Sequence, residues 1–332
     1  MILPKFQYVQ PTTLKEACSF LDQCDGEAAI LAGGTDLMIG LRRRLRKPAY
    51  VVGLKNLQGL DYILKDDAGA LHIGALASLT SVKKSALIAQ EYPALAEAVE
   101  LVAVPPIRHV ATVGGSLSLD TRCIYYNQSE FWRKARPDCL KLGGDVCHVV
   151  EKGRRCLAVY QGDLAPILVA MGAQVKIVSA EAERTIPLAQ FFTGNGERPN
   201  ILQPNELLAE VILPKRPGRT ANAYEKLRVR EGMDFPLAGV AVSLTVNGSG
   251  EIARATLVLS AVGAAPVEVA EAATIIVGKR TSDDLLEAVA QTMFEKAHPA
   301  GNLVMDPQYR RSMVRVLTKR AIRKSLQAVG GN

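Results

Sequence analysis

A long stretch in the middle of the chain has no hydrophobic periodicity, so neither a regular helix nor a strand is predicted there. It covers residues 120–160 and carries four of the six cysteines, Cys123, Cys139, Cys147 and Cys156. A loop of this length inside a compact domain is usually functional. Because such a segment offers little core in which to bury thiols, we expect the four cysteines to fold it around a metal centre.

The spacing of these cysteines favours an iron–sulfur cluster over zinc. They are separated by fifteen, seven and eight residues. Structural zinc sites favour closely spaced cysteine pairs, whereas iron–sulfur clusters accept cysteines from scattered loop positions. Four thiolates suffice for one [4Fe–4S] or one [2Fe–2S] cluster, and structural zinc is the alternative. We interpret His148 as an ordinary polar loop residue, and Cys18 and Cys24 as small buried hydrophobes.

Two glycine turns form a second group of candidate residues. Gly33-Gly34 ends the apolar run 28–32, and Gly114-Gly115 lies within residues 112–116. A glycine has no Cβ, so backbone N–H groups at such a turn can approach a negatively charged group closely. A hydroxyl residue follows each turn. A lone turn of this kind is usually structural, but the pair indicates a dinucleotide pyrophosphate, either flavin or nicotinamide.

Two other residues stand out by their context. From the residues alone, Asp163 is predicted to cap the apolar helix that follows it, and Lys226 to be a solvated strand lysine. No Walker A motif or H-E-x-x-H motif occurs in the sequence, so phosphoryl transfer and metalloprotease chemistry have little support.

The charge of the chain is unevenly distributed. The net charge of +7 arises largely from basic blocks at residues 42–47 and 310–324. With 5% aromatic residues and no nucleic-acid motif, these blocks are interpreted as solvated helix faces or as a surface that docks another subunit. The longest apolar run has about ten residues, half of what a membrane span needs. The start of the sequence has no signal-peptide pattern, so we expect a cytoplasmic protein that contacts neither membrane nor nucleic acid.

The order of predicted elements indicates an α+β chain in three parts. Residues 1–55 form a small α/β unit, whose first helix is expected to begin at a capping box over residues 13–16. Residues 56–190 form a second unit with the insertion at about 120–160, with strands expected near 71–74 and 174–178 and helices near 79–88 and 94–102. Residues 191–332 form the third part, a C-terminal α+β domain with a Gly-, Asn- and Pro-rich linker at residues 193–204. They contain strand-like runs at 207–213, 223–229, 237–246 and 252–262, and then helices at 283–296 and 308–329.

Taken together, the motifs resemble the flavin-binding medium subunits of the molybdenum hydroxylase family, which includes xanthine and carbon monoxide dehydrogenases. The resemblance rests on residues 6–11, 31–37, 107–116, 162–166, 224–227 and 234–241. It implies an FAD-binding fold shared with vanillyl-alcohol oxidase. Two α/β FAD-binding subdomains would precede a C-terminal antiparallel sheet with helices.

The resemblance also implies roles for single residues. One segment would wrap the FAD pyrophosphate: Leu31, Ala32, Gly33, Gly34, Thr35, Asp36 and Leu37. A second phosphate and ribityl contact would come from Thr112, Gly114, Gly115 and Ser116. Asp120 and Asp163 would contact adenosine or ribityl hydroxyls, and Lys226 would approach the isoalloxazine ring. No catalytic residue is expected on this chain, because substrate chemistry would take place on a partner subunit.

Within that family, the four-cysteine insertion resembles the one in the β subunits of 4-hydroxybenzoyl-CoA reductases. This implies a [4Fe–4S] cluster on Cys123, Cys139, Cys147 and Cys156. It also implies a large molybdopterin subunit and a small subunit with two [2Fe–2S] clusters, as an αβγ unit paired into a heterohexamer. The activity would be reductive dehydroxylation of 4-hydroxybenzoyl-CoA in anaerobic aromatic degradation, with electrons passing from ferredoxin through the cluster and FAD to molybdenum.

Basic residues around the cysteines would suit an acidic ferredoxin. They are Arg122, Arg133, Lys134, Arg136, Lys141, Lys152, Arg154 and Arg155. Two alternatives stay open. One is the FAD subunit of an oxidising molybdenum hydroxylase that passes electrons to NAD or a quinone, and the other is a scaffold subunit with a structural zinc site.

Overall fold

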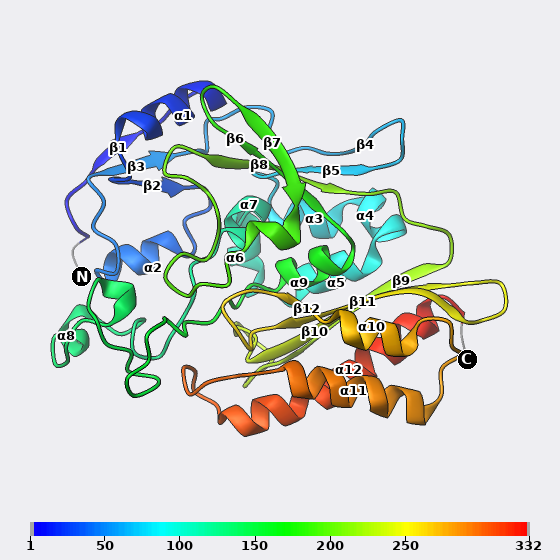
Figure 1. The fold of residues 1–332 in the computed structure, drawn as a ribbon. Coiled ribbons are helices and arrows are strands. Elements are labelled where there is room, and N and C mark those ends of the chain that lie inside the picture. Colours follow the sequence, from blue (N-terminus) through cyan, green and yellow to red (C-terminus); the bar gives the residue numbers. More distant parts are fainter. Residues whose placement is uncertain (1–2, 331–332) are drawn as a thin grey trace.

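The computed structural model describes residues 3–330, in which the strands form three sheets (Figure 1). Residues 1, 2, 331 and 332, which the predicted domains include, lie outside the described residues. No helix in the described part is both long enough and apolar enough to cross a membrane.

The first sheet is parallel, in the order β1-β3-β2. Its elements are β1 (Gln7–Val9), α1 (Leu14–Gln23), β2 (Ala28–Leu31), α2 (Leu37–Arg42) and β3 (Tyr50–Gly53). Helix α1 begins where the Thr13 hydroxyl accepts a hydrogen bond from the Glu16 amide, as the capping-box pattern predicts. The apolar face of α1, including Cys18, is buried in a core shared with β3, which holds the helix on the sheet.

The middle sheet is antiparallel, in the order β4-β5-β8-β6-β7. Its strands are β4 (Ile63–Lys65), β5 (Leu71–Gly74), β6 (Gln174–Val178), β7 (Glu183–Pro187) and β8 (Leu207–Leu213). The chain between β5 and β6 contributes α3 (Leu79–Lys84), α4 (Ala86–Glu91), α5 (Pro93–Glu100), α6 (Pro105–Val110), α7 (Val113–Leu117) and α9 (Leu164–Ala170), and a 3₁₀ turn, η2 (Leu188–Phe191), follows β7. β8 lies between β5 and β6, so this sheet contains a strand from beyond the predicted boundary at residue 190.

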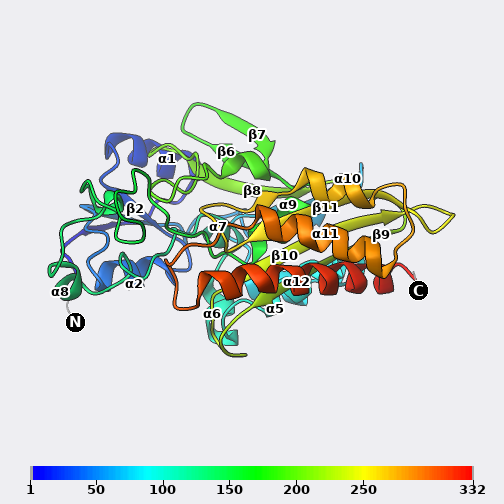
Figure 2. The same cartoon turned by 60° about the horizontal axis from the view of Figure 1, so that its bottom comes forward.

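The C-terminal sheet is antiparallel and is covered on both faces. Its strands are β9 (Thr220–Leu227), β10 (Ala238–Val246), β11 (Ile252–Ser260) and β12 (Val267–Glu268). Figure 2 shows α10 (Ala270–Ile276), α11 (Asp283–Lys296) and α12 (Pro307–Ala328) side by side along it. Val240, Val242 and Leu244 share a core with these helices, whereas Ala241 belongs to the core that includes α9. Alternate residues of a strand point to opposite faces, so β10 is buried on both faces over Ala238–Val242, whereas Ser243 and Thr245 are only partly buried.

Part of the C-terminal basic block is buried rather than solvated. Arg310 of α12 is fully buried and donates hydrogen bonds to the carbonyl oxygens of Leu237, Ala261 and Ala300. Burial lowers the pKa of its guanidinium to about 10. The prediction of a uniformly solvated or docking face was therefore wrong at Arg310, because its cation satisfies backbone carbonyls that the fold leaves without partners.

The cysteine-bearing insertion packs on the C-terminal end of α2. It contains the short helix α8 (Glu130–Arg133) and the 3₁₀ turn η1 (Leu140–Leu142). The Arg43 guanidinium donates to the Asn127 carbonyl at 2.6 Å, and Arg133 donates to the carbonyls of Arg43 and Arg44. Lys47 forms an ion pair with Glu130. The basic block at residues 42–47 thus holds the insertion against the first subdomain.

Candidate functional site

A large cleft lies between the first sheet and β8 of the middle sheet, and both glycine turns line it. Its cavity volume is about 430 Å³, within the range of about 300–1,000 Å³ that is typical of small-ligand pockets. The predicted site residues in its wall are Ala32, Gly33, Gly34, Thr35, Asp36, Leu37, Thr112, Gly114, Gly115, Ser116 and Asp120. Leu31 ends β2 immediately before this wall.

The first glycine turn packs directly against the backbone of Val110 and Ala111, which leads into the second turn. A Cβ on Gly33 would lie 1.9 Å from the Val110 carbonyl oxygen and 2.6 Å from the Val110 carbonyl carbon. Gly34 has φ +71°, a left-handed conformation that glycine adopts without strain. The second turn is a short helix, α7, whose first turn is capped by the Thr112 hydroxyl accepting from the Gly115 amide. The first turn therefore needs glycines both for its conformation and for its contact with the segment that leads into the second turn.

The first turn also presents unused backbone donors to the cleft. Within residues 3–330, the amides of Gly33, Gly34 and Thr35 donate to no backbone carbonyl. Asp36 follows them and forms an ion pair with Arg122, whose guanidinium also stacks on Phe235 at 3.9 Å. Free amide groups at a turn suit phosphate oxygens, and pairing with Arg122 offsets the charge of Asp36 near such a ligand.

Asp163 and Lys226 meet each other away from the residues that line this cleft. The Lys226 ammonium lies 3.1 Å from the Asp163 carboxylate, and the Tyr224 hydroxyl donates to the same carboxylate at 2.9 Å. Both charged side chains are almost fully buried, with exposed fractions of 2% and 5%. Burial raises the pKa of the Asp163 carboxyl, and the Lys226 charge opposes that rise. Asp163 occupies the predicted N-cap position of α9, but its carboxylate caps no amide because it binds Lys226 and Tyr224. A solvated role for Lys226 was wrong, and contact of either residue with flavin stays a prediction.

Removing one partner of this buried pair should destabilise the fold strongly. We expect Lys226→Met to lower the free energy of unfolding by about 3–5 kcal/mol, because it leaves the Asp163 carboxylate buried without a counter-charge. Denaturant unfolding of the purified chain measures this. Lys176→Met, at a partly exposed strand lysine paired with Glu183, is the control and should cost less than about 1 kcal/mol. Equal losses in the two variants would contradict the prediction.

Two short backbone pairings bring the four insertion cysteines together. Arg122 and Val159 exchange two backbone hydrogen bonds of 2.8 Å, which places the segments of Cys123 and Cys156 side by side. A second bridge pairs Cys139 with Val146, the residue before Cys147. All four cysteines line one small cavity, with Lys141 and His148 among its other residues. The fold thus gathers the predicted ligands around a single point.

The thiols do not adopt metal-binding geometry in the structure. Among the residues described, no three His, Cys, Asp or Glu side chains are placed so that they could hold a metal ion. Burial raises the pKa of the Cys123 thiol, and the nearby Cys139 and Cys147 raise it as well. Buried thiols that repel each other as thiolates are the chemistry that a cationic metal centre stabilises. The four cysteine thiols therefore suit a metal centre bound through thiolates, and the cluster itself stays a prediction.

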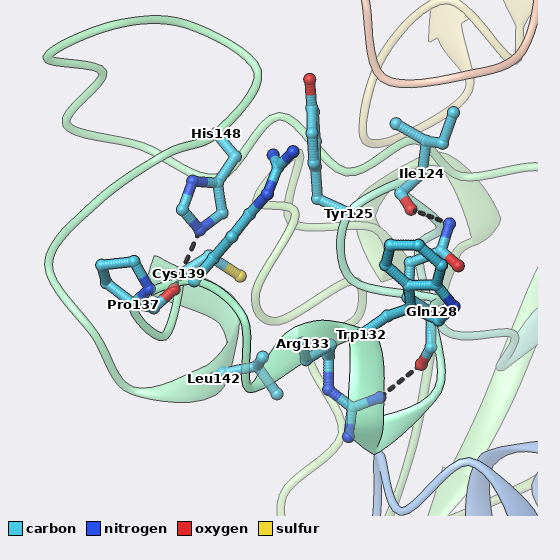
Figure 3. A pocket seen from close by; sticks show the side chains of 10 residues that line it. Ile124, Tyr125, Gln128, Trp132, Arg133, Pro137, Cys139, Leu142 and His148 are labelled. Atoms are coloured by element: carbon cyan, nitrogen blue, oxygen red, sulfur yellow. Dashed lines mark hydrogen bonds between the residues drawn. The ribbon is translucent and has the colours of Figure 1, made fainter.

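A second pocket, whose lining side chains are drawn in Figure 3, adjoins the cysteine cavity. Cys139, Tyr125 and His148 line both spaces. The pocket is bordered by Trp132, which is 65% exposed, and by Arg136, whose guanidinium lies over the Tyr125 ring at 5.1 Å. The His148 Nε2 atom is 2.9 Å from the Pro137 carbonyl oxygen, in keeping with a polar loop residue.

Some of the predicted surface cations are not at the surface. The exposed fractions of the Arg122 and Lys141 side chains are 16% and 3%. Arg122 pairs with Asp36, and Lys141 pairs with Asp120 at 2.7 Å. Arg133 is occupied by carbonyl oxygens. The prediction that these three serve an acidic partner was wrong, because their charges are used inside the chain, whereas Lys134 is 76% exposed.

Comparison with known proteins supports the flavin interpretation of the cleft. Residues 4–216 match the family described as the FAD binding domain in molybdopterin dehydrogenase, and residues 222–325 match the CO dehydrogenase flavoprotein C-terminal domain. The chain belongs to the FAD-binding subunits of the molybdenum hydroxylase family. This FAD-binding subunit is therefore part of an oxidoreductase, and the residues of its cleft fit the cofactor through the glycine turns and free amides described above.

The subunit is similar over nearly its whole length to several relatives. It is 31% identical to the aldehyde oxidoreductase FAD-binding subunit of Escherichia coli K12, over 89% of this chain and 91% of the relative. It is 26% identical to the nicotinate dehydrogenase FAD-subunit of Eubacterium barkeri, over 95% and 94%. A solved carbon monoxide dehydrogenase chain from Hydrogenophaga pseudoflava superposes with a TM-score of 0.81 at 25% identity, covering 99% of both chains. These matches confirm the predicted fold class.

Several cleft residues were not predicted from the sequence. Arg122 and Thr121 reach the cleft from the start of the insertion, and residues 197–200, 202–204 and 206–208 line another side. The latter belong to the linker and to β8, whose composition suggested only a connection and a strand. A short polar loop has no periodicity that would reveal a ligand-facing role, so the sequence held no usable indication.

Proposed function

We propose that this subunit carries FAD and a [4Fe–4S] cluster in a molybdenum enzyme that removes the phenolic hydroxyl of 4-hydroxybenzoyl-CoA. Two electrons and two protons would convert the substrate into benzoyl-CoA and water, with reduced ferredoxin as the electron donor. The substrate would react on a large molybdopterin subunit, and a small subunit with two [2Fe–2S] clusters would complete an αβγ unit, paired into a heterohexamer. A cytoplasmic location stays a prediction.

The observation that carries this proposal is the cavity lined by Cys123, Cys139, Cys147 and Cys156. The cysteine cavity is separate from the flavin site, since none of the four cysteines lines the flavin cleft. When bound there, a cluster supplies one-electron transfer at a potential that the surrounding charges and hydrogen bonds set. The protein's own contribution is to hold the four thiols together through the two backbone bridges.

The position of the cavity supports an external electron donor. The adjoining pocket in Figure 3 is bordered by Trp132, which is exposed, and by Arg136, and Lys134 is nearby in sequence. Phe131 beside them is 81% exposed. Exposed aromatic and cationic side chains next to a redox site suit an acidic carrier protein such as ferredoxin.

The alternative is an oxidising molybdenum hydroxylase that passes substrate electrons to NAD or a quinone. The names of the relatives favour it, because they include nicotinate dehydrogenase and carbon monoxide dehydrogenase. In that reading the cysteine cavity would hold an accessory centre. A structural zinc site in the same cavity is the second alternative.

Metal and flavin content of the anaerobically purified subunit tests the proposal. About four irons and one FAD per chain, with visible absorption from both, is the expected result for one cubane cluster. Zinc in place of iron would support a structural site and refute the electron-transfer role of the insertion. FAD without any metal would leave an ordinary FAD-binding subunit and refute the cluster.

A donor assay on the complete enzyme separates the two directions of electron flow. We expect reduced ferredoxin to reduce the bound flavin at least about tenfold faster than NADH does, because charge complementarity speeds encounter with the insertion. The flavin absorbance after rapid mixing gives both rates. Faster reduction by NADH, or oxidation of the reduced enzyme by NAD alone, would favour the oxidising hydroxylase.

A further inference from the structure

Lys141 lies in the wall that separates the flavin cleft from the cysteine cavity. It is two residues from Cys139 and lines the cavity, and its side chain is 3% exposed. Its ammonium donates to the Asp120 carboxylate at 2.7 Å and to the Thr121 hydroxyl at 2.6 Å. Asp120 and Thr121 line the flavin cleft. Lys141, in the wall of the cysteine cavity, therefore contacts two residues of the flavin cleft.

A third contact of Lys141 leads back to a cysteine. The ammonium also donates to the Gly196 carbonyl at 2.5 Å. Gly196 packs so closely on Cys156 that a Cβ there would lie 2.8 Å from the Cys156 sulfur. The Lys141 ammonium is 5.0 Å from the centre of the Tyr126 ring, and Tyr126 lines the same cavity. The lysine thus joins three separate segments, at residues 120–121, 139–141 and 196.

Asp120, which pairs with the Lys141 ammonium, has two other polar partners close by. Asp120 also lies 3.6 Å from the Arg46 guanidinium, which is half exposed, and receives a hydrogen bond from the Tyr126 hydroxyl. A buried cation beside a thiolate group favours the reduced, more negative state of that group, because charges interact strongly where water is excluded. Its hydrogen bonds also hold the cleft wall in place.

We propose that Lys141 is a positioning residue that links the two redox sites, holding Asp120 and Thr121 for the flavin and placing a positive charge beside the cysteine-bound cluster. This inference rests on the proposed function, since it assumes that FAD and a cluster occupy the two sites. In this proposal the Lys141 side chain both holds the cleft wall in place and sets part of the cluster's reduction potential.

The test compares Lys141→Gln with the unaltered subunit in the assembled, anaerobic enzyme. Glutamine keeps donors of similar reach but removes the charge. We expect the reduced-to-oxidised ratio of the cluster at a fixed potential to fall about tenfold, equal to a shift of about 59 mV for one electron, measured by redox titration with EPR. We expect the dissociation constant for FAD to rise severalfold. Lys134→Gln, at an exposed lysine of the same insertion, should change neither value.

Two further variants separate charge from structure. Lys141→Arg should restore the potential, because it restores the charge. Asp120→Asn leaves Lys141 without its counter-charge and should shift the potential in the opposite, positive direction, which settles the question even if Lys141→Gln fails to fold. Unchanged potentials in the variants that fold would overturn the proposal, and so would weaker FAD binding alone. Absence of iron in the unaltered subunit would instead refute the proposed function, before any variant is compared.

Discussion

Gly33→Ala is expected to abolish flavin binding. The new Cβ would lie 1.9 Å from the Val110 carbonyl oxygen, so the first glycine turn must move away from the segment that leads into the second. Neither side can yield by rotating a side chain, because the contact is between backbone segments. Such overpacking costs about 1–3 kcal/mol of stability. The cleft wall formed by both turns would lose its shape, and the flavin absorbance per chain after gel filtration should fall to near zero.

The matched control for this prediction is Gly218→Ala. A Cβ at Gly218 meets no atom within 4 Å among the described residues, so flavin content should not change. Circular dichroism and thermal unfolding of both variants show whether the Gly33 variant is folded. A folded Gly33→Ala chain that retains full flavin would show that this close backbone contact is not needed for the cofactor.

Cys147→Ser is expected to remove the iron while leaving the flavin in place. Cys147 lines the cysteine cavity but not the flavin cleft, so its loss removes one ligand without touching the flavin wall. A serine hydroxyl is a poor substitute for a thiolate in a cluster that needs four. Iron analysis should fall from about four per chain to below about one, since partial clusters are unstable, while flavin absorbance stays at one per chain.

Cys24→Ser provides the comparison for the cysteine variant. Cys24 is buried at the end of α1, outside the insertion, so its replacement should leave iron and flavin unchanged. Equal iron in both variants would exclude Cys147 as a ligand. Loss of flavin together with full iron in Cys147→Ser would show that the insertion serves the cleft rather than a cluster.

Elements with clear local patterns were predicted well from the sequence. β5, β6 and β8 occur at the predicted residues, as does α11, because each is an apolar or amphipathic run bounded by turn residues. The long helix predicted over residues 79–88 is instead two helices. Ser85 ends α3 and its hydroxyl caps α4, a competition between a local cap and helix continuation that periodicity does not detect.

Long-range contacts of charged residues were predicted poorly. From the sequence, Lys226 was predicted to be solvated and Lys141 to face a partner protein. The structure instead buries Lys226 against Asp163 and Lys141 against Asp120, carboxylates that are distant in the sequence. Arg310 reads as part of a basic helix face and instead binds carbonyl oxygens. A charged residue has the same local signature whether it is solvated or paired, so its partner emerges only when the chain is folded.

The sequence by itself determined the family, the three sheets' principal strands and the two glycine turns, because these depend on short-range patterns and on motifs that span a few residues. Only the tertiary structure decided that the two turns meet in one cleft and that two backbone bridges gather four scattered cysteines around one cavity. It also decided that Lys141 stands between them. The physical reason is that burial and pairing depend on which distant segments the core brings together, and no local sequence pattern encodes which segments these are.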